Sequence, residues 1–118
     1  MKSKILSRLM DIHIAIDQIF DFLPEPRDYF EFKKDLKTRK AIERNIEIIG
    51  EAVNQVLKAD PEIQISNSRK IVDTRNRIIH GYDSVSPETI WGISIKHLPK
   101  LKDEIKELIQ QFESKGDL

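Results

Sequence analysis

The sequence of 118 residues contains no cysteine, which excludes a disulfide framework and any metal site built on thiolates. It also has no excess of either charge, because 20 basic residues stand against 20 acidic ones. A protein that only coats nucleic acid is usually more basic, so any basic surface must be local. Charged residues interrupt the apolar N-terminal segment, which leaves no signal-peptide core and no membrane span. We therefore expect a cytoplasmic protein that does not enter a membrane.

What the sequence does contain is a series of amphipathic segments, in which apolar residues recur every three or four positions. This spacing predicts helices over residues 3–23, 36–59, about 67–81 and 87–112, with a short helical turn over 28–32. Prolines at positions 24, 26, 61 and 87 separate these segments, and Pro99 should kink the last helix. Residues 113–118 are predicted to form a polar, frayed tail. The length fits a single domain, residues 1–118, folded as an all-α antiparallel four-helix bundle.

The segment over 67–81 carries polar residues where the helical pattern requires apolar ones. Apolar residues at positions 71, 72, 78 and 79 mark one face of a helix, and the centre of that face holds Arg75 and Asn76. Burying a guanidinium without partners is costly, so its placement here indicates a partner or a task. His80 follows Asn76 by four residues, and Tyr82 follows Arg75 by seven. Four polar side chains are therefore expected to gather toward one patch.

These side chains suit chemistry on a phosphodiester. Histidine carries protons near neutral pH, and arginine offers a fork of donors to phosphate oxygens and to the charge of a phosphorane. One histidine without a nearby carboxylate pair provides too few ligands for a metal. The pattern therefore indicates metal-independent cleavage of RNA, without a cofactor and with the 2′-hydroxyl as nucleophile. A buried hydrogen-bond network that fixes helix register explains Arg75 and Asn76 equally well.

The spacing of Arg75 and His80 raises a geometric question. Five residues turn a regular helix by about 140°, so the two side chains do not share a face. Either the helix distorts before Gly81, or the working site joins residues from two subunits of a two-fold dimer.

The helix over residues 36–59 supplies candidate partners for this site. Glu43, Glu47 and Glu51 recur every four residues, so they can pair with neighbouring cations, or one of them can face Arg75. Gly50 lies in the same helix, where a small residue suits close packing of a second helix. The basic residues between positions 33 and 44 are interpreted as a solvated face rather than an RNA-binding patch, because acidic residues are interleaved.

A family resemblance favours the catalytic interpretation. The stretch RNRIIHGY, from Arg75 to Tyr82, resembles the Arg-x4-His-x-Tyr signature of the HepT-like branch of HEPN-domain ribonucleases. Residues 44–52, RNIEIIGEA, resemble the second-helix segment of that family, and residues 87–99 resemble the start of its last helix. The resemblance implies a homodimeric HEPN-like bundle with composite active sites, metal-independent RNA cleavage, and the role of toxin in a toxin–antitoxin module.

The resemblance also assigns roles to individual residues. Arg75 and His80 would be the catalytic pair, with Asn76 as the polar residue beside the arginine. Tyr82 would be the residue to which a cognate MntA-type nucleotidyltransferase transfers AMP from ATP. A bulky, charged adduct so close to His80 would block the site and repel RNA. Two other functions stay open: a non-catalytic helical partner that binds substrate or nucleotide for a nucleotidyltransferase, and a structural dimer held in register by the polar cluster.

Overall fold

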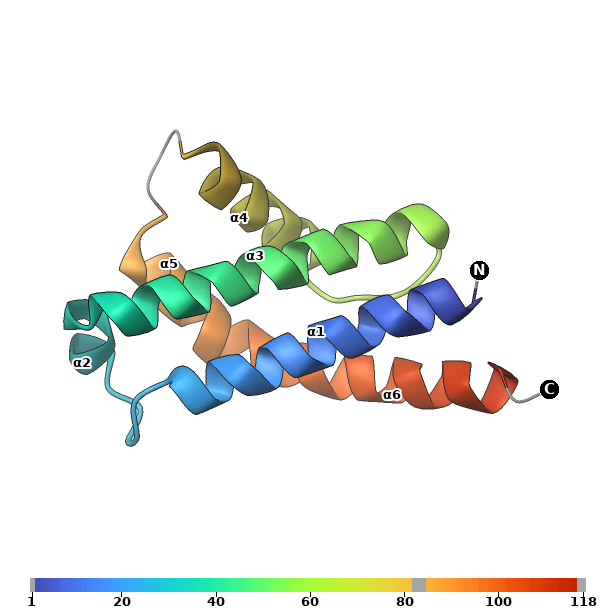
Figure 1. Cartoon of the computed structure of the whole chain (residues 1–118), viewed down its shortest axis with the longest axis horizontal. Helices are drawn as coiled ribbons and strands as arrows, with labels where there is room; N and C mark the ends of the chain where they lie inside the picture. The colour runs from blue at the N-terminus through green and yellow to red at the C-terminus, as the bar shows by residue number, and fades with distance from the viewer. Residues whose placement is uncertain (1, 82–84, 117–118) are drawn as a thin grey trace.

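The computed structural model describes residues 2–81 and 85–116, and within these ranges the regular structure is helical (Figure 1). The predicted all-α bundle is confirmed. Four long helices form the body of the molecule, and α2 and α5 are short additional helices. In chain order the elements are α1 (Lys2–Phe22), α2 (Tyr29–Lys34), α3 (Leu36–Ala59), α4 (Ser68–His80), α5 (Pro87–Gly92), the π-helix η1 (Ile93–His97) and α6 (Leu98–Gly116).

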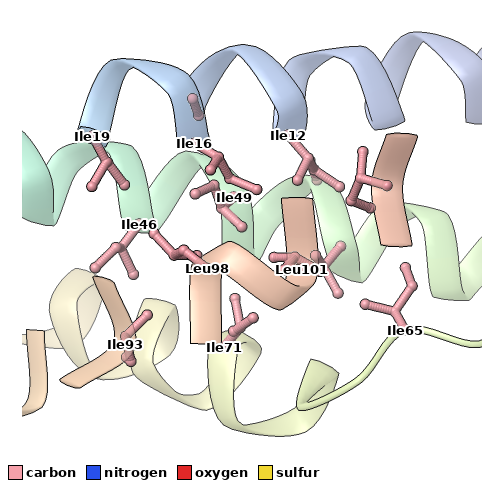
Figure 2. Packing of buried hydrophobic residues seen from close by; sticks show 14 of the residues in the cluster. Ile12, Ile16, Ile19, Ile46, Ile49, Ile65, Ile71, Ile93, Leu98 and Leu101 are labelled. Carbon is pink, nitrogen blue, oxygen red and sulfur yellow. The ribbon is translucent and has the colours of Figure 1, made fainter. Parts of the chain in front are cut away.

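The hydrophobic core lies where α1, α3 and α6 pack together, and α4 contributes to it from one side. Branched aliphatic side chains of these elements point toward one another (Figure 2). Fully burying one such side chain stabilises the fold by roughly 1.5–3 kcal/mol. The core residues that are no more than 1% exposed include Ile12, Ile16, Ile19, Ile46, Ile49, Ile71, Ile93, Leu98 and Leu101.

Side-chain caps determine where several helices begin. The Asp28 carboxylate accepts a hydrogen bond from the Phe30 backbone N–H at 2.9 Å, and this cap starts the predicted short helix α2. Asp35 caps α3 through the backbone N–H and hydroxyl of Thr38, which together lower the pKa of the Asp35 carboxyl. At the other end of a helix, Gly81 closes α4 with a left-handed φ of +66°.

The last helical run is less regular than the sequence predicts. Pro99 has no N–H for the Ile95 carbonyl, and the turn before it widens into η1, where the Leu98 N–H reaches the Ile93 carbonyl. Figure 1 shows α5 set at an angle to α6, so the expected bend is spread over a whole turn. The predicted frayed tail is wrong for residues 113–116, because α6 continues to Gly116. Phe112 packs against the core at this end and supports the added turn; residues 117–118 lie outside the described ranges.

A polar and aromatic contact joins α2 to α5. The Tyr29 hydroxyl donates a hydrogen bond to the Glu88 carboxylate, which raises the pKa of Tyr29 and lowers the pKa of Glu88. The Tyr29 ring also meets the Trp91 ring edge-on at 5.8 Å between centroids. This contact holds α5 against α2. In the described part of the chain, no helix combines the length and the apolar character that crossing a membrane requires.

Candidate active site on helices α3 and α4

Gly50 and Arg75 mark the point where α3 and α4 approach most closely. A Cβ atom built on Gly50 would lie 2.4 Å from the Arg75 Cβ and 3.1 Å from the Ile71 carbonyl oxygen. No side chain fits in that space, so glycine is required for α4 to lie this close to α3. The glycine that the sequence marked as a packing residue therefore places Arg75 directly on the α3 backbone.

The Arg75 guanidinium is held by two acceptors. Its Nη2 lies 2.6 Å from Glu51 Oε2, and its Nη1 donates to Asn76 Oδ1 at 2.9 Å. Its Nε is buried and has no hydrogen-bond partner. The Arg75 side chain is 25% exposed and that of Glu51 is 41% exposed, so the pair lies at the edge of the core. The guanidinium is thus fixed in orientation, and part of it still faces the surface.

A shallow groove of about 270 Å³ opens beside this pair, between α1, α3 and the last turns of α4. Each arginine of the groove has a carboxylate close by: Arg8 with Asp11 at 3.7 Å, Arg44 with Glu47 at 2.9 Å, and Arg75 with Glu51. The charges of the groove therefore balance. An anion that enters it must compete with these carboxylates for the guanidinium groups. The groove is lined by Arg8, Asp11, Arg44, Glu47, Ile48, Glu51, Ala52, Arg75 and Ile79.

His80 lies in the last turn of α4 and is exposed. Helix α4 is a regular α-helix from Ser68 to His80, without the distortion that the sequence left open as one alternative. The rotation of about 140° between Arg75 and His80 therefore holds in the folded chain. Arg75 packs against α3, and His80 lies on a different side of the α4 axis at the end of the helix.

The structure brings two of the four predicted site residues together and shows contacts that the sequence did not predict. Arg75 and Asn76 do come together, and Glu51 is the glutamate that faces the arginine. Glu43 and Glu47 instead approach the cations next to them in the helix, Lys40 at 3.8 Å and Arg44 at 2.9 Å. Tyr82 lies outside the described residues. The direct contact between Gly50 and Arg75 was not predicted. It could have been inferred, because Gly50 is next to Glu51, one of the three glutamates considered as partners of Arg75.

No cluster of metal-binding side chains is seen at this site. Within residues 2–81 and 85–116, no three His, Cys, Asp or Glu side chains gather closely enough to hold a metal ion. What the site offers instead is a fixed guanidinium, an amide and an exposed imidazole on one helix. These groups bind anions and exchange protons. The fold and the site together define a helical-bundle protein with a fixed arginine at the edge of a surface groove.

Comparison with known proteins identifies the family of this chain. The profile of the family described as "Ribonuclease HepT-like" matches residues 12–108. A protein of Methanocaldococcus jannaschii described as a putative RNase is 32% identical over 98% of this chain and 96% of its own length. A probable ribonuclease HepT of Thermococcus cleftensis is 33% identical over 92% of this chain and 98% of its own length. No solved structure matches the chain at a significant level.

The chain therefore belongs to the HepT-like ribonuclease family, as the sequence predicted, and its enzyme class is endoribonuclease.

Proposed function

We propose that this protein is the toxin of a toxin–antitoxin pair and cleaves RNA without a metal ion, at sites completed by two subunits of a homodimer. The observation that carries the proposal is the placement of Arg75. Its guanidinium is fixed by Glu51 and Asn76 at the edge of a groove, and His80 lies five residues further along the same regular helix, about 140° around its axis. A two-fold dimer in which the ends of α4 meet would bring Arg75 of one subunit toward His80 of the other.

In this mechanism His80 moves the protons and Arg75 stabilises charge. The 2′-hydroxyl attacks the adjacent phosphorus as the His80 imidazole removes its proton, and the resulting imidazolium then gives that proton to the departing 5′-oxygen. The products are a 2′,3′-cyclic phosphate and a 5′-hydroxyl. Arg75 donates to the phosphorane oxygens as negative charge develops on them. Asn76 acts as a positioning residue, because its side-chain oxygen accepts a hydrogen bond from Arg75.

We further propose that a cognate MntA-type nucleotidyltransferase silences the enzyme by modifying Tyr82. The tyrosine oxygen attacks the α-phosphorus of ATP, pyrophosphate leaves, and AMP stays on the side chain. Tyr82 follows His80 by two residues, so the adduct would put a phosphate and a nucleoside beside the imidazole. Its negative charge would repel an RNA backbone, and its size would occlude the site.

The first test is cleavage of labelled RNA in the presence of a chelator, by the purified protein and by a folded His80→Ala variant. We expect the wild type to cleave and the variant not to cleave. The mass of the tryptic peptide that contains Tyr82 must be measured in parallel, because a preparation carrying AMP would be silent. Equal cleavage by both proteins, or none by unmodified wild type on several RNAs, would contradict the proposal. The second outcome would favour a non-catalytic partner of a nucleotidyltransferase.

A mixed dimer tests the composite site directly. Arg75→Ala and His80→Ala chains with different affinity tags are co-expressed, and the heterodimer is isolated by sequential purification. If the site is shared between subunits, one of the two sites in this heterodimer has both native side chains. We then expect about half of the wild-type activity. If each site lies within one chain, the heterodimer will be as inactive as the two parent homodimers.

A further inference from the structure

A second groove lies on the other side of α4 and differs from the first in charge. It has a volume of about 520 Å³ and is formed by the start of α3, the end of α4 and the residues that lead into α5. Among the residues that the structure describes, Arg39, Lys40 and Arg77 line it, with Glu43 as the one carboxylate. These described lining residues carry three positive charges and one negative charge, in a chain whose total is zero. The remaining lining residues are Ile78, Gly81, Val85, Ser86 and Pro87.

Two of the three cations of this groove lack the carboxylate partners that the arginines of the first groove have. Among the described residues, no carboxylate lies within ion-pair distance of Arg39 or Arg77, whereas Lys40 pairs with Glu43 at 3.8 Å. The Nε of Arg39 is buried and has no hydrogen-bond partner, although the residue as a whole is half-buried. The terminal nitrogens of the Arg39 guanidinium, at the groove, can still donate to a ligand with acceptor oxygens.

The two grooves follow one another along α3. Lys40 lines one and Ile48 lines the other, which puts them about 12 Å apart along the helix axis at 1.5 Å per residue. The C-terminal half of α4, which ends at His80, contributes residues to both grooves. A ligand that spans both must be long and must carry acidic groups at intervals. A nucleic acid backbone has this form.

We infer that the groove of Arg39, Lys40 and Arg77 binds backbone phosphates of the RNA substrate, next to the nucleotides that are cleaved. This inference rests on the proposed function and supplies the RNA-binding surface that the neutral overall charge leaves unassigned. Arg39 donates to a phosphate oxygen through the terminal nitrogens of its guanidinium, and Lys40 and Arg77 contribute charge at the rim. Glu43 opposes binding, because its carboxylate repels phosphate.

The test is binding of a fluorescent single-stranded RNA in which every 2′-hydroxyl is methylated, so that it cannot be cleaved. Fluorescence anisotropy is measured over a range of salt concentrations for the wild type and the triple variant Arg39→Gln, Lys40→Gln, Arg77→Gln. Each lost phosphate contact lowers the slope of log K against log salt by about 0.7 for a single strand. We expect a slope smaller by about two and an affinity lower by about ten-fold or more for the triple variant.

Two further variants make the test specific to the groove. Lys100→Gln with Lys106→Gln removes charge from exposed positions of α6, and should reduce the affinity less than two-fold, an effect of screened surface charge alone. Glu43→Gln should increase the affinity by about two- to five-fold, because it removes the opposing carboxylate. If the triple variant does not fold, the double variant Lys40→Gln, Arg77→Gln alters only exposed side chains and should show about two-thirds of the slope change of the triple variant.

Unchanged binding by a folded groove variant would overturn the inference, and so would an equal loss in the α6 control. Failure of the wild type to bind RNA at low salt would overturn it as well. None of these results depends on cleavage. If the wild type binds RNA through this groove but leaves cleavable RNA intact, the proposed function is refuted and the inference about the groove is supported. If the groove variants still cleave RNA and bind it with unchanged affinity, the proposed function is supported and the inference about the groove is refuted.

Discussion

Helix α3 carries polar contacts on two sides, and the two sides differ in how completely those contacts are satisfied. Toward α1, Asn45 is only 6% exposed, and its side-chain amide donates to the Ala15 carbonyl oxygen at 3.2 Å and to Gln18 Oε1 at 2.9 Å. Both N–H groups of this amide are used. Toward α4, Arg75 is more exposed, is held by Glu51 and Asn76, and retains a buried Nε without a partner.

This difference separates a polar group that holds the fold from one that is available for chemistry. An enclosed and saturated amide has no donor left for a ligand, so its contribution is to fix the register of α1 on α3. A fixed guanidinium at the edge of a groove has spare donors and an approach from solvent. Both residues interrupt apolar helix faces, and only their surroundings distinguish them.

The largest expected effect is on RNA cleavage, and it comes from replacing Arg75. Arg75→Leu should lower RNA cleavage by at least about 100-fold, because the phosphorane loses its charge-assisted donors. Its unfolding free energy should stay within about 1 kcal/mol of the wild type or rise, because an apolar side chain can replace a buried ion pair. Urea denaturation and single-turnover cleavage measure the two properties.

Asn45→Leu is the matched change on the other side of α3. It leaves the Ala15 carbonyl and the Gln18 amide oxygen without their donor, and should reduce the unfolding free energy by roughly 1–3 kcal/mol. Cleavage per folded molecule should stay near the wild-type rate. If Arg75→Leu and Asn45→Leu both lose stability, or both lose cleavage, the distinction between a catalytic contact and a structural one is wrong.

The second prediction concerns the glycine on which the α4 contact depends. In Gly50→Ala the new methyl group would need the space of the Arg75 Cβ, so α4 must move away from α3. We expect a loss of stability of about 1–3 kcal/mol from overpacking, together with weaker cleavage because Arg75 moves with its helix. Gly92→Ala is the control, since nothing lies within 4 Å of its added Cβ. It should stabilise the protein by roughly 0.5–1 kcal/mol. Equal behaviour of the two alanines in thermal denaturation would refute the close contact.

The sequence predicted the fold well because helix signals are local. The apolar spacing, the prolines and the capping residues each act within a turn or two, and they placed every long helix within a few residues of its observed ends. The errors occurred where packing between distant segments decides. Pro99 predicted a kink, but the sequence did not show that the turn before it widens into η1. The extension of α6 to Gly116 goes with the packing of Phe112 against the core, a contact that no local pattern records.

The candidate site could be predicted only in part for the same reason. An arginine in the centre of an apolar stripe is visible in the sequence, and so is the periodic row of glutamates on α3. Which glutamate faces Arg75 depends on the position along the α3 axis at which α4 packs, and Gly50 determines that position. The basic groove joins residues about 40 positions apart, so the sequence showed its lysines and arginines only as a solvated helix face.

The third prediction tests how Glu51 acts on Arg75. Glu51→Gln keeps an oxygen that can accept from Nη2, so kcat should stay within about three-fold of the wild type, whereas Glu51→Ala should lower kcat about ten-fold because the guanidinium loses its fixed orientation. Glu47→Ala, in the same groove but next to Arg44, should change kcat by less than two-fold, as expected for a surface ion pair. A glutamine variant as impaired as the alanine variant would show that the negative charge matters rather than the position.

The smallest expected effect is a pH dependence of the folding stability. It involves His97 and its neighbour Lys70 on α4, and it does not involve the Asn45 contact. Burial lowers the pKa of His97 below its ordinary value of 6.5, and the charges of Lys70 on α4 and of Lys96 lower it further. The unfolded chain therefore binds this proton more readily than the folded chain does. The corresponding stability is fully present above pH 6.5, decreases as the pH falls through 6.5, and decreases no further once the pH is below the folded pKa.

Melting temperatures measured between pH 7.5 and 5 check this prediction. The wild type should lose stability below about pH 6.5, His97→Gln should lose less, and Lys70→Gln should lie between them because one repelling charge is gone. Asn45, Gln18 and the Ala15 carbonyl do not titrate, so Asn45→Leu should lower the melting temperature without altering the shape of its pH profile. A profile that His97→Gln leaves unchanged would assign the acid sensitivity to another group. A profile that Asn45→Leu flattens would show that the two sides of α3 are coupled, and the comparison between them would fail.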